Sequence, residues 1–195
     1  LKALSEQYDR FGILQIDAHA DLRKSYEGFT YSHASIMYNA LKLPAVGRLV
    51  QVGIRDFCEE EANIMQRAMG RVVTFYDEDI KDYLFHGKTW DTICDEIIGQ
   101  LPKHVYISFD IDGLDPKLCP ATGTPVAGGL EFYQAIYLIK KLVLAERKII
   151  GFDLCEVSPG HDDWDANVGA RILYQLSNWC AASHKKLPLK FRLQR

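Results

Sequence analysis

The sequence lacks the features that mark membrane proteins, nucleic-acid-binding proteins and disulfide-bonded secreted proteins. Its apolar runs are far shorter than the roughly 20 residues that a membrane-spanning helix requires. Asp and Glu (26) outnumber Lys and Arg (23), so the net charge of -3 provides no general attraction for nucleic acid. The five cysteines are odd in number and form no CxxC pair, which indicates reduced thiols in a cytoplasmic protein. We therefore expect neither a membrane nor a nucleic acid as a partner.

The remaining composition is typical of a globular domain. The chain has 195 residues, of which 48% are hydrophobic and 25% are charged, which is enough for one sizeable core. No internal repeat or low-complexity linker divides the sequence, so residues 1–195 are expected to form a single domain. Because the first residue is Leu1 rather than Met, we expect the chain to be part of a longer gene product.

Apolar, β-branched runs of strand length alternate with helical patterns along the chain. The predicted strands, each apolar on both faces, are Gly12–Ile16, Arg48–Ile54, Arg71–Tyr76, His104–Phe109 and Lys148–Leu154. The helical spacing of apolar residues is clearest in Trp90–Leu101, Leu130–Val143 and Val168–Trp179. Acidic clusters at residues 59–61 and 77–82 are expected at helix starts, on a face in contact with solvent. This alternation predicts an α/β fold with a parallel sheet covered by helices.

Acidic residues follow three of the five predicted strands. They are Asp17 and Asp21 after the first strand, Asp110 and Asp112 after the fourth, and Glu156 after the fifth. In open parallel sheets ligands bind outside the carboxyl ends of the strands, so we expect these groups to converge there with His19. Each Asp-x-Asp pair alone is common in turns and caps. Together, however, the ionised carboxylates would repel one another without a cation. Mixed oxygen and nitrogen ligands suit Mn, Fe or Zn better than Ca, and their number is enough for two ions.

Four ordered motifs resemble the ureohydrolase family of arginases and agmatinases. They are DAHAD at 17–21, SFDIDGLDP at 108–116, ATGTPVAGGL at 121–130 and GFDLCEVSP at 151–159, and the resemblance covers residues 12–180. It implies a three-layer α/β/α fold with a mostly parallel sheet and two manganese ions at the sheet edge. It also implies hydrolysis of a guanidino group to urea and an amine, by a homo-oligomer that is a trimer or a hexamer.

The resemblance further assigns roles to individual residues. The implied manganese ligands, of which Asp17 and Asp110 would bridge the two ions, are Asp17, His19, Asp21, Asp110 and Asp112. The implied catalytic residues are Asp21, His33 and Glu156, and the implied substrate contacts are Thr124 and Glu156. His33 would shuttle protons between the site and bulk water. The alternatives are a surface cap of a helix for His33 and a helix cap or structural salt bridge for Glu156.

The chemistry of a guanidinium explains why such residues would be needed. This cation is resonance-stabilised and is a poor electrophile, so its hydrolysis needs a strong nucleophile in a fixed position. Two ions about 3.5–4 Å apart can activate a water between them. Asp21, as an implied ligand with a free oxygen, would help transfer the proton of that water toward the leaving amine. The planar carboxylate of Glu156 matches the planar guanidinium.

The substrate is less well specified by the sequence. Arginases of this family recognise their substrate through a Ser-Gly-Asn loop, and residues 22–29 contain no such motif. Glu27 would favour a substrate with a distal ammonium, whereas Arg23 or Lys24 would favour a distal carboxylate. We expect agmatine, hydrolysed to putrescine, and keep guanidinobutyrate, formiminoglutamate and arginine as alternatives.

One motif of the family has no counterpart in this sequence. Family members carry a Gly-Gly-x-His segment upstream, whose histidine completes the first metal site, and no such segment occurs here. Three hypotheses follow: the C-terminal part of a dinuclear ureohydrolase, a catalytically silent ureohydrolase-like binding protein, or a metal-dependent phosphohydrolase or glycosyltransferase. The last lacks a phosphate-binding glycine loop. We expect this chain to bind one of the two ions weakly and to expose an edge of its sheet.

Overall fold

A five-stranded parallel sheet forms the centre of the protein in a computed structural model, which describes residues 1–160 and 162–185. The strand order is β3-β2-β1-β4-β5, and every neighbouring pair is parallel. The strands are β1 (Phe11–Ile16), β2 (Val46–Ile54), β3 (Val72–Tyr76), β4 (His104–Asp110) and β5 (Lys148–Cys155). All five predicted strands are thus confirmed, with ends that differ by two residues at most.

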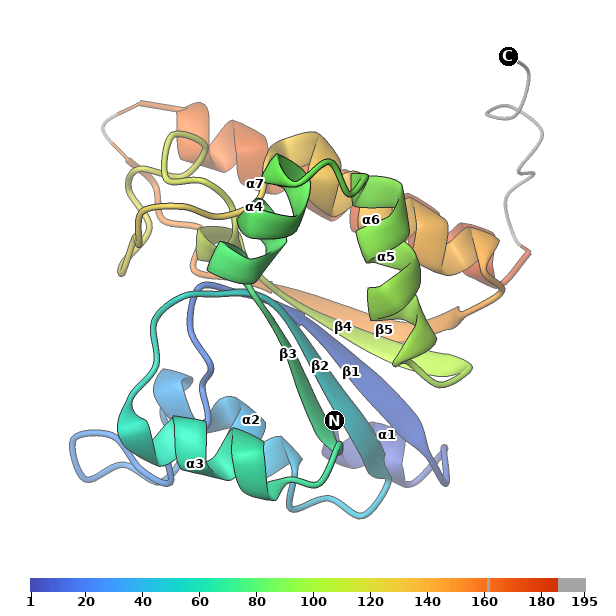
Figure 1. The fold of residues 1–195 in the computed structure, drawn as a ribbon. Helices are drawn as coiled ribbons and strands as arrows, with labels where there is room; N and C mark the ends of the chain where they lie inside the picture. The colour runs from blue at the N-terminus through green and yellow to red at the C-terminus, as the bar shows by residue number, and fades with distance from the viewer. Residues whose placement is uncertain (161, 186–195) are drawn as a thin grey trace.

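Helices cover both faces of this sheet and give three layers (Figure 1). One face carries α1 (Lys2–Ser5), α2 (Ile36–Ala40) and α3 (Glu59–Arg67). The opposite face carries α4 (Asp77–Phe85), α5 (Trp90–Gly99), α6 (Phe132–Leu144) and α7 (Trp164–Ser183). Short 3₁₀ turns lie at His33–Ser35 and Ile111–Gly113. The predicted three-layer α/β/α fold is confirmed.

Alternate positions of the strands face two separate cores. Leu14 and Ile16 of β1 belong to the larger core, with apolar side chains of α5, α6 and α7. Phe11 and Ile13 point the other way, into a smaller core that includes Met37 of α2. This alternation follows from the two-residue period of a strand. It places successive side chains of β1 on opposite faces, so residues 13, 15 and 17 share the face of the smaller core.

Buried polar residues refine two of the expectations. Both faces of β1 are buried, as expected, but the buried positions include the polar side chains of Gln15 in β1 and Gln51 in β2. The acidic clusters do begin α3 and α4, yet Glu61 and Asp77 are buried rather than solvated. Both carboxylates accept backbone hydrogen bonds from other segments, Glu61 from Leu22 N and Asp77 from Gly129 N. These bonds compensate for part of the lost hydration, and Lys81 Nζ lies 3.6 Å from Asp77 Oδ1, which accepts no hydrogen bond from any described residue.

The topology determines where a ligand can bind. β2 and β3 lie on one side of β1, and β4 and β5 lie on its other side. The direction of the strand order therefore reverses between β1 and β4. A crevice at the carboxyl ends of the strands is expected at such a switch point. The residues that follow β1 and β4 lie there. No helix among the described residues is long and apolar enough to cross a membrane.

Candidate metal centre

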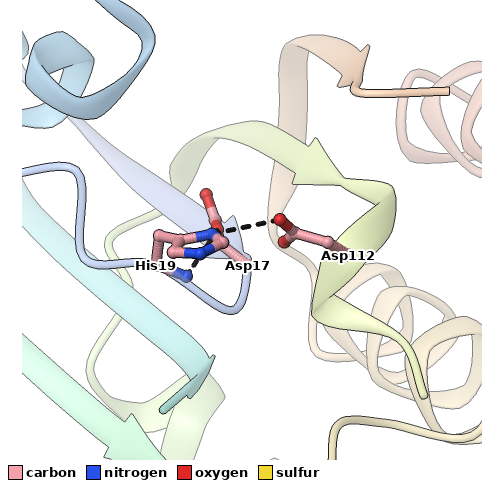
Figure 2. A group of neighbouring side chains, drawn as sticks. All are labelled: Asp17, His19 and Asp112. Carbon is pink, nitrogen blue, oxygen red and sulfur yellow. Dashed lines mark hydrogen bonds and ion pairs between the residues drawn. The ribbon is translucent and has the colours of Figure 1, made fainter. Parts of the chain in front are cut away.

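Three potential metal ligands meet where β1 and β4 end. Nδ1 of His19 lies 3.0 Å from Oδ2 of Asp112 and 3.5 Å from Oδ1 of Asp17. One ligand atom from each of these three side chains lies within 4.8 Å of those of the other two. Figure 2 shows the imidazole between the two carboxylates, with Asp17 and His19 on the segment after β1 and Asp112 after β4. This spacing suits a shared cation.

Backbone amides hold the two strand ends in this arrangement. Asp17 Oδ1 accepts a 2.7 Å bond from His19 N, and Asp112 Oδ1 accepts a 3.0 Å bond from Ala18 N. Asp110 Oδ1 in turn accepts a 3.0 Å bond from Asp112 N. Gly113 allows the close approach, because a β-carbon there would lie 2.7 Å from Asp17 N. The glycine of the SFDIDGLDP motif is therefore needed for the close packing of this segment against the end of β1.

Mutual repulsion and burial disfavour the charged forms of three of these carboxyls. Burial, with the charge of Asp112, raises the pKa of Asp17 to about 6. Burial, with the charges of Asp17 and Asp110, raises the pKa of Asp21 to about 10. Burial, with the charges of Asp17 and Asp112, raises the pKa of Asp110 to about 9. Protein groups alone thus compensate this acidic cluster only in part.

His19 supplies the compensation that the protein does provide. Hydrogen bonds to Asp112 and then Asp17 raise the pKa of His19 to about 10. Burial of Asp112 opposes its ionisation, but the bonds from His19 and Ala18 outweigh burial and lower the pKa of Asp112. The donor set, carboxylate oxygens with one imidazole nitrogen, fits a divalent cation of the manganese, iron or zinc type. Such an ion would take over the neutralising role of the His19 proton.

Asp21 has an unusual backbone conformation next to this cluster. Its φ of 56° lies in the left-handed region, which is uncommon for a residue with a β-carbon. The conformation directs its carbonyl toward α2, where it accepts bonds from Met37 N and Tyr38 N. Its buried carboxyl lines the candidate site and makes no hydrogen bond or ion pair with any described residue. The backbone therefore holds a carboxyl whose oxygens remain available.

A cavity of about 480 Å³ opens above the cluster, and it is lined by all eight residues predicted as metal ligands, catalytic residues or contacts of the guanidino group. Glu156 reaches it from beyond β5, again with a left-handed backbone (φ 59°). Its Oε2 lies 3.2 Å from the position that a β-carbon of Gly123 would occupy, and its carbonyl accepts a bond from Thr122 Oγ1. The exposed Thr124 is on the same loop. The structure brings these residues together, while their individual roles stay predictions.

The mouth of the cavity contains Arg23 and His33, which were named from the sequence, and Tyr26 and Asp56, which were not. The guanidinium of Arg23 lies over the ring of Tyr26, 5.4 Å from its centroid, and Tyr26 contacts the His33 ring edge-on. Asp56, whose side chain is 63% exposed, lies across from them with its Oδ2 3.8 Å from His19 Nε2. Lys24 and Glu27 do not line the cavity, and Lys24 pairs with Glu60. Of the described histidines, His19 and His33 alone line it.

Arg55 connects the loops around the site and was also missed. Its guanidinium donates to the carbonyls of Asp112 (2.7 Å), Leu114 (3.2 Å) and Val126 (2.9 Å). These bonds tie the end of β2 to the segment after β4 and to the loop that carries Thr124. Nothing in the sequence indicated this role, because Arg55 lies outside the recognised motifs. Its partners are backbone carbonyls of residues that are distant in the sequence.

Comparisons with known proteins agree with this geometry. The sequence model of the arginase family matches residues 1–177. An N(1)-aminopropylagmatine ureohydrolase of Thermus thermophilus is 35% identical over 176 residues, covering 89% of this chain and 55% of the relative. The guanidinobutyrase of Pseudomonas aeruginosa is 33% identical, covering 90% of this chain and 54% of the relative.

The same similarity is seen in three dimensions. The structure of proclavaminate amidino hydrolase from Streptomyces clavuligerus superposes with a TM-score of 0.78 at 26% identity, covering 94% of this chain and 59% of that one. The chain spans about half the length of the curated relatives it matches. Residues 1–177, which the family model matches, include all five strands and the cluster at their carboxyl ends.

Proposed function

The chain belongs to the arginase family, and from this membership and its carboxylate cluster we propose that it acts in hydrolysing a guanidino group to urea and an amine. The observation that carries the proposal is the convergence of Asp17, His19 and Asp112 within 4.8 Å at the base of the cavity. Asp21 and Asp110 would add further ligands for two Mn²⁺ ions, and the upstream histidine that completes the first site in the family has no counterpart in this sequence. When bound, these ions would activate a water and neutralise the carboxylates.

The chain's own residues orient the substrate. The carboxylate of Glu156 would accept two N–H bonds from the guanidinium, a planar bidentate match that fixes the reacting carbon over the cluster. Thr124, on the loop packed against Glu156, would contact the same group from the side. The bound guanidinium would thus be held in one plane, which lowers the entropic cost of the reaction.

Two further residues would move protons. Asp21 has an available carboxyl oxygen at the cluster, so it can accept the proton of the attacking water and pass it to the leaving amine nitrogen. His33 is exposed at the mouth, where it can exchange protons with bulk water. The T-shaped contact with Tyr26 holds the His33 ring at that position.

We infer agmatine, hydrolysed to putrescine, as the substrate that best fits the mouth of the cavity. Agmatine carries a distal ammonium, while guanidinobutyrate carries a distal carboxylate. Arg23 is already engaged by Tyr26 and by Glu61, whose Oε2 lies 3.8 Å from Arg23 Nε. Asp56 presents a largely exposed carboxylate that can accept an ammonium. The arrangement therefore favours a distal cation.

The cellular location and the oligomeric state are proposed from the cysteines and from the family resemblance. The five cysteines are odd in number and form no CxxC pair, which favours a reducing, cytoplasmic location. The family resemblance suggests a homo-oligomer, a trimer or a hexamer. Neither a membrane nor a nucleic acid is proposed as a partner.

Urea release from the Mn²⁺-loaded chain tests the proposed function. Agmatine, guanidinobutyrate, formiminoglutamate and arginine would be supplied in turn, with EDTA-treated protein as the control. Urea formed from agmatine in preference to the other three supports the proposal. Manganese binding without urea from any of them would favour a silent binding protein. Hydrolysis of a phosphate monoester without urea release would favour the phosphohydrolase alternative.

A further inference from the structure

A row of polar side chains crosses all five strands just below the candidate metal centre. Strand register pairs Gln51 with Thr74 and with Gln15, Gln15 with Ser108, and Ser108 with Asp153. Residues in register on parallel strands share a face, so the five side chains form one line across the sheet. The row lies on the same face of the sheet as Asp17 and Asp110, two residues before each of them. On the same face, two residues before each member of the row, the side chains are mostly apolar: Ile13, Leu49, Val72, Tyr106 and Gly151.

In one half of this row, side-chain hydrogen bonds form a series that ends on Asp17. Thr74 Oγ1 donates to Gln51 Oε1 (2.9 Å), and Gln51 Nε2 donates to Gln15 Oε1 (2.7 Å). Gln15 Nε2 donates to Asp17 Oδ2 (2.8 Å) and to the carbonyl of His19 (3.2 Å). Gln51 Nε2 also donates to the carbonyl of Ala20. The amides of Gln15 and Gln51 thus also support the segment that follows β1.

The order of these bonds fixes the orientation of each amide. Because the carbonyl oxygen of Gln15 faces the NH₂ group of Gln51, its own NH₂ group must face Asp17. The reverse orientation would place two oxygens against each other at the Asp17 end of Gln15 and two NH₂ groups against each other at the Gln51 end. The carbonyl of Ala20, which can only accept, fixes Gln51 in the same way and leaves its Oε1 facing the hydroxyl of Thr74. Hydrogen bonds connected in series also polarise one another, which strengthens the last bond in the chain.

We propose that Gln15 is a positioning residue for Asp17, and that Gln51, oriented by the carbonyl of Ala20 and bonded at its own oxygen by Thr74, holds the Gln15 amide in the donating orientation. The inference rests on the proposed function only in treating Asp17 as a metal ligand. With Oδ2 held by Gln15 and Oδ1 by His19 N, the carboxylate plane is fixed before an ion binds. Partners of this kind typically contribute about 10–100-fold to metal affinity.

Simple filling of the core does not explain the row. Gln15 and Gln51 are both fully buried, where an apolar side chain of similar length would avoid the desolvation of an amide. The other half of the row provides a comparison, because Ser108 Oγ donates to Asp153 Oδ1 and contacts no candidate ligand. Only the half that ends on Asp17 connects buried amides to the site.

Three variants test this inference. Gln15→Met removes the amide with little change in length, Thr74→Val removes the distal hydroxyl without touching the site, and Ser108→Ala removes a buried hydroxyl from the same row as the matched control. The dissociation constant for Mn²⁺ is measured by EPR, in which free and bound Mn²⁺ are distinguished. The thermal midpoint of the metal-free protein is measured in parallel, since a merely structural role would change only that quantity.

The expected result is a loss of Mn²⁺ affinity of about 10–100-fold for Gln15→Met. Thr74→Val is expected to give a smaller loss in the same direction, and Ser108→Ala none beyond its effect on the thermal midpoint. Equal affinity of Gln15→Met and the unmodified chain, or an equal loss in Ser108→Ala, would overturn the inference. So would an unmodified chain that binds no Mn²⁺. If the chain binds Mn²⁺ with the expected pattern but releases no urea, the proposed function fails while the inference stands.

Discussion

Nδ1 of His19 and Oδ2 of Asp112 lie 3.0 Å apart, although the two residues follow different strands and are distant in the sequence. The contact exists because β1 and β4 are neighbours with Ile16 in register with Phe109. A shift of this register by one residue would turn the side chains to the opposite face. The candidate metal centre is therefore a direct consequence of the parallel pairing of β1 and β4.

Replacing Asp112 by Asn is expected to weaken metal binding and to lower the pKa of His19. The hydrogen bond to Asp112 is the largest cause of the raised His19 pKa, and Asn carries no charge to sustain it. The Mn²⁺ dissociation constant should rise by about 10-fold or more, since even outer partners of ligands contribute that much. An NMR titration of the His19 ring and an Mn²⁺ titration check the two effects. Asp115→Asn, in the same motif but outside the cavity, should change neither.

Stability of the metal-free protein is expected to fall between about pH 6.5 and pH 10. The pKa of His19 is raised from 6.5 to about 10 on folding, so its stabilisation is complete below pH 6.5 and is lost as the pH approaches 10. The raised pKa values of Asp21 and Asp110 act in the same direction. Thermal midpoints measured in EDTA at pH 6 and pH 9 test this expectation. A higher midpoint at pH 9 would contradict the electrostatics of the cluster.

Binding of Mn²⁺ is expected to release protons and to strengthen as the pH rises over the same range. His19 must lose its proton to coordinate through Nδ1, and ionisation of Asp21 and Asp110 increases the number of charged ligands. Calorimetry in buffers with different ionisation enthalpies measures the number of protons released. Net proton uptake on binding would be incompatible with these ligands.

Gly113→Ala is expected to destabilise the fold by about 1–3 kcal/mol. The added β-carbon would lie 2.7 Å from Asp17 N and 2.9 Å from Ile16 C, which are backbone atoms that cannot easily move. Gly99→Ala is the control, because its β-carbon meets nothing within 4 Å and lies at the end of α5. Chemical or thermal unfolding gives both values. Similar stabilities of the two variants would show that β1 and the β4 segment can separate at no cost.

Asp56→Asn is expected to raise the KM for agmatine more than that for guanidinobutyrate. The change removes an exposed carboxylate at the mouth while preserving its shape. Arg23→Gln, at the same mouth, should have the smaller effect on agmatine because Arg23 is held by Glu61 and Tyr26. Steady-state urea release gives the KM values. Since Asp56 lies 3.8 Å from His19, Mn²⁺ affinity is measured alongside to separate substrate recognition from metal binding.

The sequence predicted the sheet well because apolar runs and helical periods are local patterns. It also predicted that the acidic residues after the strands lie close to His19, because the carboxyl ends of parallel strands share one edge of the sheet. Gln15 and Gln51 were missed because each stands alone in an apolar run, and their partners come from neighbouring strands. The available signal was a single glutamine in each of two successive predicted strands that are otherwise mostly apolar.

The mouth of the cavity was harder to predict for a different reason. Residues 22–29 follow no periodic pattern, so Arg23, Lys24 and Glu27 were equal candidates from the sequence. Their positions in the fold distinguish these three candidates. Lys24 forms an ion pair with Glu60 and Glu27 lies outside the cavity, whereas Arg23 lies at its mouth. The role of Asp56 depends on β2 ending beside His19, which only the pairing of the strands reveals.

The most direct test of the account is Mn²⁺-dependent urea release from agmatine, compared between the unmodified chain and the Asp112→Asn variant. We expect urea from the Mn²⁺-loaded chain, none after removal of the metal by EDTA, and little from Asp112→Asn at the same Mn²⁺ concentration. A chain that binds Mn²⁺ yet releases no urea from agmatine or the other guanidino compounds would contradict the proposed function. So would an Asp112→Asn variant as active as the unmodified chain.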